Sequence, residues 1–114
     1  MIEILIREHL ETALAVPAVL EVPAKPPETF VLIERTGGGQ QGLLCTPTFA
    51  VQSYGPSLQA AARLNERVKA AMGTLAALPQ ICRVQLNTDY NFTDPVSKRY
   101  RYQAVFHITH YREG

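Results

Sequence analysis

The chain has 114 residues, of which 46% are hydrophobic and 18% charged, and its formal net charge is +1. This size and composition predict one folded domain, residues 1–114, and argue against a disordered or disulfide-dependent protein. The near-neutral charge argues against a general electrostatic attraction to nucleic acid or to an anionic membrane.

The N-terminal segment and the two cysteines indicate the compartment. Apolar and charged residues alternate from Ile2 to His9, so the uninterrupted apolar core of a signal peptide is missing, and we find no transmembrane segment. We therefore expect synthesis in a reducing compartment, with Cys45 and Cys82 as free, buried thiols. Neither cysteine belongs to a Cys-x-x-Cys pair, which argues against a zinc site.

The first predicted element is a helix over residues 2–14. Its apolar residues recur at helical spacing, and Pro17 ends it because proline lacks the backbone N–H and crowds the preceding turn. Residues 19–22 could form a short extended segment, and the prolines that follow exclude a regular central strand there. The apolar stripe of the helix is Ile2, Leu5, Ile6, His9, Leu10 and Ala13.

The next segment predicts a β-hairpin. Residues 30–35 are apolar enough for a central strand, and residues 43–54 alternate as a second strand, with Pro47 marking a bulge or an edge. The glycine-rich stretch between them predicts a flexible loop at or near the tip of the hairpin. This loop consists of Gly37, Gly38, Gly39, Gln40, Gln41 and Gly42.

A second helix and a second strand pair complete the chain. Ser57 is a good N-cap for a helix that runs to about Leu78, before Pro79. Residues 81–92 and 100–111 then form an antiparallel pair, turned near Asp94-Pro95. The order helix-strand-strand-helix-strand-strand predicts an α+β fold: a single four-stranded, largely antiparallel sheet with two helices packed on one face.

The final strand has two distinct faces. Alternation predicts one apolar face toward the core, made of Tyr100, Tyr102, Ala104, Phe106 and Ile108. The opposite face is more polar and could be covered by a neighbouring subunit. It consists of Arg101, Gln103, Val105, His107 and Thr109.

Two motifs look like phosphate or metal sites but fit ordinary structure better. Residues 37–42 lack the Gly-Lys-Ser/Thr ending of a phosphate loop and do not open a helix. His107 and His110 are three residues apart on a strand, so they point to opposite faces and cannot share one ion. His9 is expected to be a partly buried core histidine with satisfied hydrogen bonds. We therefore expect no metal and no cofactor.

The segment from Lys98 to Tyr102 mixes cations with aromatic rings, as surfaces that bind single-stranded nucleic acid do. Because the rest of the chain lacks excess basic charge, a solvated strand start with core-facing tyrosines is the favoured interpretation. Asp89 and Asp94 have no neighbouring histidine or metal pattern, so they do not indicate an acid–base pair. We expect no catalytic residue and no enzymatic activity.

Several stretches together resemble a known family. They are PPETFVLIERTGG at residues 26–38, LNTDYNFTD at 86–94 and RYRYQAVFHITHY at 99–111, with QSYG at 52–55 and ARLN at 62–65. They resemble small proteins from the head–tail morphogenesis region of long-tailed bacteriophages and prophages of Gram-positive bacteria. Those proteins are similar to tail-terminator and head–tail joining proteins.

The resemblance implies a single tail-terminator-like domain that closes into a ring, commonly a hexamer. Such a ring caps the finished tail tube, ends its polymerisation and joins the tail to the head. The implied partners are further copies of the chain, the major tail tube protein and the head connector, with DNA passing through the ring. The resemblance implies a virion protein of the tail or neck, assembled in the host cytoplasm, with no cofactor. The glycine loop is then a candidate assembly arm, and the polar face of the final strand a candidate interface.

Two functions from other classes stay open. A small nucleic-acid-binding module would use the segment from Lys98 to Tyr102, and its binding would weaken steeply with salt. A small-molecule-binding or enzymatic α/β domain would have a deep polar pocket within the monomer.

Overall fold

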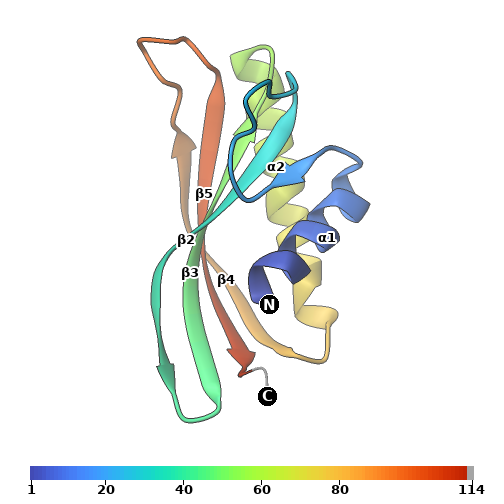
Figure 1. Ribbon diagram of the computed structural model, residues 1–114, viewed down its shortest axis with the longest axis vertical. Coiled ribbons are helices and arrows are strands. Elements are labelled where there is room, and N and C mark those ends of the chain that lie inside the picture. The colour runs from blue at the N-terminus through green and yellow to red at the C-terminus, as the bar shows by residue number, and fades with distance from the viewer. Residues whose placement is uncertain (113–114) are drawn as a thin grey trace.

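In the computed structural model of the protein, which describes residues 1–112, two helices lie against one face of a β-sheet (Figure 1). The molecule is elongated, with principal extents of 43 × 25 × 24 Å. No helix within this described range is long and apolar enough to cross a membrane. The elements in chain order are α1 (Ile2–Leu14), β1 (Ala18–Val19), β2 (Phe30–Gln41), β3 (Leu44–Tyr54), α2 (Leu58–Thr74), the 3₁₀ helix η1 (Leu75–Ala77), β4 (Ile81–Asn91) and β5 (Arg101–Tyr111).

The sheet has five strands in the order β1-β2-β3-β5-β4. The predicted α+β class with two helices is confirmed, but the prediction of four strands is wrong. The fifth strand is β1, whose Ala18 and Val19 pair in parallel with Val31 and Leu32 of β2. All other pairs are antiparallel, so the sheet is mixed. A strand of two residues is too short for its alternation to be recognised in the sequence. Only its pairing with β2 identifies it as part of the sheet.

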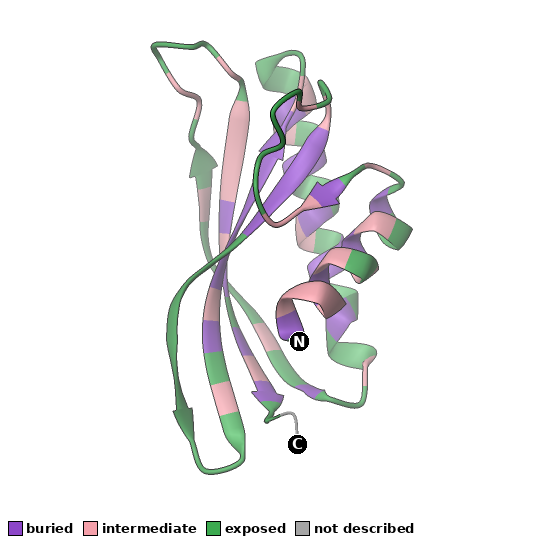
Figure 2. Cartoon of the chain, viewed as in Figure 1, coloured by how far each residue is buried: buried purple, intermediate pink, exposed green. Residues whose placement is uncertain are grey.

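The core lies between the helices and one face of the sheet, where the buried residues of Figure 2 concentrate. Each helix contributes one apolar stripe, as its spacing predicts. On the sheet side, β3 and β5 supply the central part of this core. Its fully or almost fully buried residues include Ile6, Leu10, Leu14, Ala18, Val31, Ile33, Phe49, Val51, Leu64, Val68, Met72, Leu75, Ala104, Phe106 and Ile108.

The ends of α2 follow from local chemistry. Ser57 is the N-cap, and its hydroxyl oxygen accepts a hydrogen bond from the Ala60 N–H at 3.1 Å. This confirms the predicted cap. At the other end the α-helix stops at Thr74, earlier than the predicted limit near Leu78, and its continuation tightens into η1. A final 3₁₀ turn is a common way to end a helix, here just before Pro79.

The hairpin of β2 and β3 differs from the predicted loop. Strand β2 continues through the glycines to Gln41, and the tip is only Gly42 and Leu43. The stretch of residues 37–41 is therefore paired with β3, and a bulge at Thr36 shifts the register between Arg35 and Gly37. Glycines carry no strand signal of their own, so only the backbone of β3 reveals that they belong to a ladder.

The hairpin of β4 and β5 ends near the predicted turn. The Asp94 carboxylate accepts hydrogen bonds from the Val96 N–H at 3.0 Å and from the Ser97 hydroxyl at 2.8 Å. These bonds are typical of an Asx-type turn. They hold the pKa of Asp94 below its usual value, chiefly through the Ser97 hydroxyl. This turn and the tip of the β2–β3 hairpin lie at opposite ends of the molecule (Figure 1).

Candidate functional site

The face of the sheet that points away from the helices carries the predicted interface residues. In β5 the buried Ala104, Phe106 and Ile108 alternate with residues that are half-buried or exposed. Tyr100 precedes the strand and is 37% exposed, so its predicted place in the core is wrong. Tyr102 is half-buried. The open-face residues are Arg101, Gln103, Val105 and Thr109, each half-buried, and the exposed His107.

Gln52 of β3 is the centre of a polar network on this open face. Its amide nitrogen donates to Glu34 Oε1 at 3.0 Å and to Gln103 Oε1 at 2.9 Å. Its amide oxygen accepts from the Tyr54 hydroxyl at 3.1 Å and from Arg101 Nη1 at 3.4 Å. Gln52 is only 5% exposed, and these bonds use all four of its hydrogen-bonding positions. The network ties β2, β3 and β5 together on the side without helices.

Arginine side chains cover the aromatic rings at one end of the open face. Phe30 and Tyr54 stack with ring centroids 4.4 Å apart, and the Arg99 guanidinium lies 5.1 Å from the Tyr54 centroid. Arg101 lies 4.4 Å from the Phe92 ring, and its Nε donates to the Phe92 carbonyl at 2.7 Å. These rings pack on cations of the same chain, an arrangement that contributes a cation–π attraction.

This packing bears on the role of the segment from Lys98 to Tyr102. For this segment the sequence favours a solvated strand start with core-facing tyrosines over a surface that stacks bases. Arg101 uses its donors on Phe92, Tyr54 and Gln52, so it acts mainly as an internal clamp. Lys98 is exposed and has a positive φ of 55°. Arg99 is half-buried with its guanidinium over the Tyr54 ring, so Lys98 is the one exposed cation of residues 98–102.

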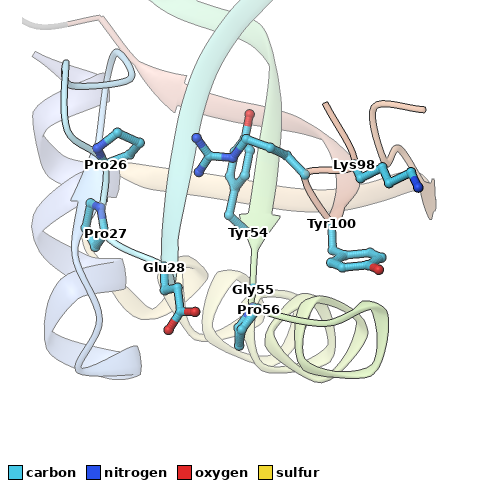
Figure 3. A pocket seen from close by; sticks show the side chains of 9 residues that line it. Pro26, Pro27, Glu28, Tyr54, Gly55, Pro56, Lys98 and Tyr100 are labelled. Atoms are coloured by element: carbon cyan, nitrogen blue, oxygen red, sulfur yellow. The ribbon is translucent and has the colours of Figure 1, made fainter. Parts of the chain in front are cut away.

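A shallow cavity lies beside these two cations (Figure 3). Its volume is about 300 Å³, the lower limit of ordinary ligand pockets. Pro26 and Pro27 lie on one side of Tyr54, and Lys98 and Tyr100 lie on the other. The lining is completed by Glu28, Arg99, Gly55 and Pro56. Cations and a carboxylate share the rim, so the lining does not select a ligand of one charge.

A second polar cluster joins α2 to the outer strand β4. Asp89 Oδ2 accepts from Asn65 Nδ2 at 2.8 Å and lies 3.0 Å from Lys69 Nζ. The hydrogen bond from Lys69 lowers the pKa of Asp89, and the bond from Asn65 acts in the same direction. The pKa of Lys69 is raised, first by its bond to Glu66 and then by Asp89. Asp89 therefore links β4 to the helix layer.

The end of the β2–β3 hairpin is exposed and partly apolar. Leu43 at the tip is 71% exposed, and its neighbour Leu44 is 40% exposed. Leu44 pairs with Tyr111 of β5, which is 55% exposed. Gly37, Gly38, Gly39, Gln40, Gln41 and Gly42 are all exposed, as Figure 2 shows for this end of the sheet. The predicted assembly loop is thus a pair of hydrogen-bonded strands with an exposed apolar tip.

The histidines and cysteines have ordinary surroundings. His107 is exposed beside Thr48 Oγ1 at 3.0 Å, whereas His110 is buried on the other face, which confirms that they point apart. His9 is half-buried, and its Nε2 lies 2.9 Å from the Ala71 carbonyl, as expected of a satisfied core histidine. Cys45 is half-buried and Cys82 exposed, so the prediction of buried thiols is wrong. Among residues 1–112, no three His, Cys, Asp or Glu side chains are grouped to hold a metal.

Comparison with known proteins gives a likeness in structure alone. No model of a known protein family matches the chain, and no curated protein is similar to it in sequence. A solved structure, the virion of a native gene transfer agent particle, contains a chain with TM-score 0.54 and 12% identity. The match covers 93% of this chain and 84% of that one.

The fold is shared with a chain of a virion. Because the match extends over nearly the whole of both chains, it concerns the complete arrangement of helices and sheet and not a common fragment. At 12% identity the likeness establishes the fold, and it transfers no residue of the open face or of the hairpin.

Proposed function

We propose that the protein is a structural component of a phage-like virion. The observation that carries this proposal is the shared fold with a chain of the gene transfer agent particle, over 93% of this chain. The resemblance of residues 26–38, 86–94 and 99–111 to head–tail morphogenesis proteins supports the same class independently. Both lines favour a role in assembly. The resemblance to head–tail morphogenesis proteins implies neither enzymatic activity nor a cofactor for this role.

Within this class, we propose that the protein is a tail terminator or head–tail joining subunit. It forms a ring, with a hexamer as the expected size, that caps the tail tube and ends its polymerisation. Its partners are further copies of itself, the major tail tube protein and the head connector, and DNA passes through the ring. It is part of the tail or neck of the virion and assembles in the cytoplasm of the bacterial host.

The exposed surfaces support an assembly role in physical terms. A ring needs a heterologous interface, in which one patch of a subunit meets a different patch of the next. The open face around Gln52 is polar, well ordered by hydrogen bonds and uncovered by helices. The hairpin presents Leu43 at one end of the molecule, and the β4–β5 turn presents Val96, 91% exposed, at the other. These ends offer distinct contacts for the tube and for the connector.

Negative-stain electron microscopy of the purified full-length protein tests this function, alone and mixed with tail tubes built from a phage major tail tube protein. We expect rings, or caps at one end of the tubes together with a defined tube length. Light scattering gives the number of subunits. Tubes that grow without limit and carry no cap in the presence of the protein would refute the terminator role.

A nucleic-acid-binding module is the second candidate, favoured by Lys98 and Arg99 beside the rings of Tyr54 and Tyr100. It predicts binding to single-stranded DNA that weakens with salt, with a logarithmic slope near 0.7 for each phosphate contacted. Fluorescence anisotropy with a labelled oligonucleotide measures that slope.

The cavity beside Lys98 and Arg99 is the place where a small-molecule ligand would bind, and a thermal-shift screen would detect such binding.

A further inference from the structure

The sheet has two long free edges, on opposite margins of the same sheet. One is the outer edge of β4, Ile81–Asn91, which ends the strand order. The other is the outer edge of β2 beyond Leu32, because β1 covers only Val31 and Leu32. Along an edge, alternate residues direct their backbone N–H and C=O groups away from the sheet, where they can accept a further strand.

Neither free edge carries the lysine or proline that commonly protects an edge strand. Natural edge strands are short or carry lysine and proline. Strand β4 has eleven residues and contains neither lysine nor proline. Its charged residues are Asp89, which is already bound by Lys69, and the exposed Arg83. On β2 the charged Glu34 and Arg35 are followed by residues 36–41, which carry no charge and are all exposed. The Arg35 side chain reaches the Gly37 carbonyl only at 3.4 Å, in an exposed bond that a strand partner could replace.

Bulges interrupt both edges but leave regular segments between them. The extra residues are Cys82 and Asn87 on β4 and Thr36 on β2, so residues 83–86, 88–91 and 37–41 keep an unbroken ladder with their inner neighbours. Gly37 concerns how closely another strand can approach the β2 edge. A Cβ atom there would meet nothing within 4 Å and its φ is not positive, so the fold of the monomer does not require glycine at this position. A glycine in a strand permits another backbone to approach closely.

We propose that the free edge of β2 in one copy pairs with the free edge of β4 in the next copy. This inference rests on the proposed function, because a ring requires two different patches. Pairing of like edges, β2 with β2 or β4 with β4, would be self-complementary and would stop at a dimer. Pairing of β2 with β4 leaves one free edge of each kind on every growing assembly, so addition continues until the twist of the sheets closes a ring.

Two double variants block the edges separately. Gly37→Lys with Gly39→Lys charges the β2 edge, where Gly39 has only an ordinary 3.6 Å contact with Thr46 Oγ1. Gln85→Lys with Asn87→Lys charges the β4 edge at two exposed positions. Thr12→Lys with Ala77→Lys adds the same charge at exposed helical positions and is the matched control. Circular dichroism and urea unfolding confirm that each variant folds.

The assembly state is then measured by light scattering and negative-stain microscopy of the full-length proteins, alone and with tail tubes. We expect the control to form rings and each edge variant to lose self-association by about tenfold or more. An equal mixture of the two edge variants should give a heterodimer, because each keeps the edge that the other lacks.

The outcomes separate this pairing from the function on which it rests. Rings that persist in either edge variant would overturn the pairing and leave the ring intact. Edge variants that both stay monomeric when mixed would overturn the β2-to-β4 arrangement. A wild-type protein that remains monomeric with and without tubes would overturn the ring and the pairing together.

Discussion

Gly38 of β2 lies directly against Pro47 of β3, and a Cβ atom on Gly38 would collide with the backbone of Pro47 and with the Thr46 carbonyl oxygen. The φ of Gly38 is 115°, a conformation that L-residues rarely adopt. This close pair lets the hairpin continue as a strand through its glycine stretch.

Gly38→Ala should therefore weaken the outer half of the hairpin. We expect a loss of about 1–3 kcal/mol in local stability, from backbone strain and the collision with Pro47. Gly37→Ala, one residue away in open space, is the control and should change stability by less than about 0.5 kcal/mol. Hydrogen exchange of the Thr46 and Thr48 amides measures both effects. Equal exchange rates in the two variants would contradict the special role of Gly38.

Gln52 should contribute strongly to stability although it is polar. Gln52→Ala removes the partner of Glu34, Gln103 and Tyr54 at a site that is 5% exposed, so we expect a loss of about 1–3 kcal/mol in the free energy of unfolding. Gln85→Ala, on the exposed strand β4, is the control and should cost less than about 0.5 kcal/mol. Urea denaturation followed by circular dichroism compares the two. A Gln52 variant as stable as the Gln85 variant would argue against the network.

The Asp89–Lys69 pair should make stability depend on pH at both limits. The folded-state pKa of Asp89 lies below 3.8, so its contribution is complete above that pH and is lost as pH falls through the folded value. The pKa of Lys69 lies above 10.5, so its contribution is complete below that pH and is lost as pH rises further. Asp89→Asn should lower stability at neutral pH by about 0.5–1 kcal/mol for a partly exposed pair.

The same variant should also flatten the loss of stability below about pH 4. Thermal unfolding measured from about pH 2 to about pH 7 gives the slope of stability against pH. Glu21→Gln changes an exposed carboxylate of the β1–β2 loop and is the control. An acid slope that is identical in wild type and Asp89→Asn would show that the pair does not contribute.

The hairpin tip should matter for assembly but not for folding. Leu43→Asp places a carboxylate where the side chain is 71% exposed, so we expect a change below about 0.5 kcal/mol in stability. If Leu43 contacts the tube or a neighbouring copy, the variant should be recovered with tail tubes in a much smaller amount, measured by co-sedimentation. Val96→Asp makes the same change at the opposite end and identifies which end faces the tube. Undiminished recovery of both variants would exclude a contact through either tip.

Several features were predictable because they depend on one element at a time. The stripe of α1 and the position of Pro17 predict residues 2–14 as a helix, and the helix has those bounds. Ser57 caps α2 through a bond to its own first turn. The alternation in β5 places Ala104, Phe106 and Ile108 in the core. Side-chain periodicity and helix capping depend on residues that are close together in the sequence. They can therefore be predicted without knowing which residues are in contact in the folded protein.

Other features depend on partners that are distant in sequence. Gln52 was recognisable only as one polar residue in an alternating strand, and its role exists because Gln103 and Arg101 lie beside it in β5. Residue 65, which the helical pattern gave no reason to single out, is a buried asparagine that binds Asp89 across the gap to β4.

Composition, periodicity and capping predict the two helices, the inward and outward faces of β5 and a near-neutral charge. Contacts between distant segments determine that β1 joins the sheet, that the glycines form a strand against Pro47, and that β3 lies beside β5. The reason is that a ladder is a property of two backbones, and its free edges become visible only when every strand has been given its neighbours. The free edges of β2 and β4 therefore follow from the order of the strands in the sheet and not from the residues along them.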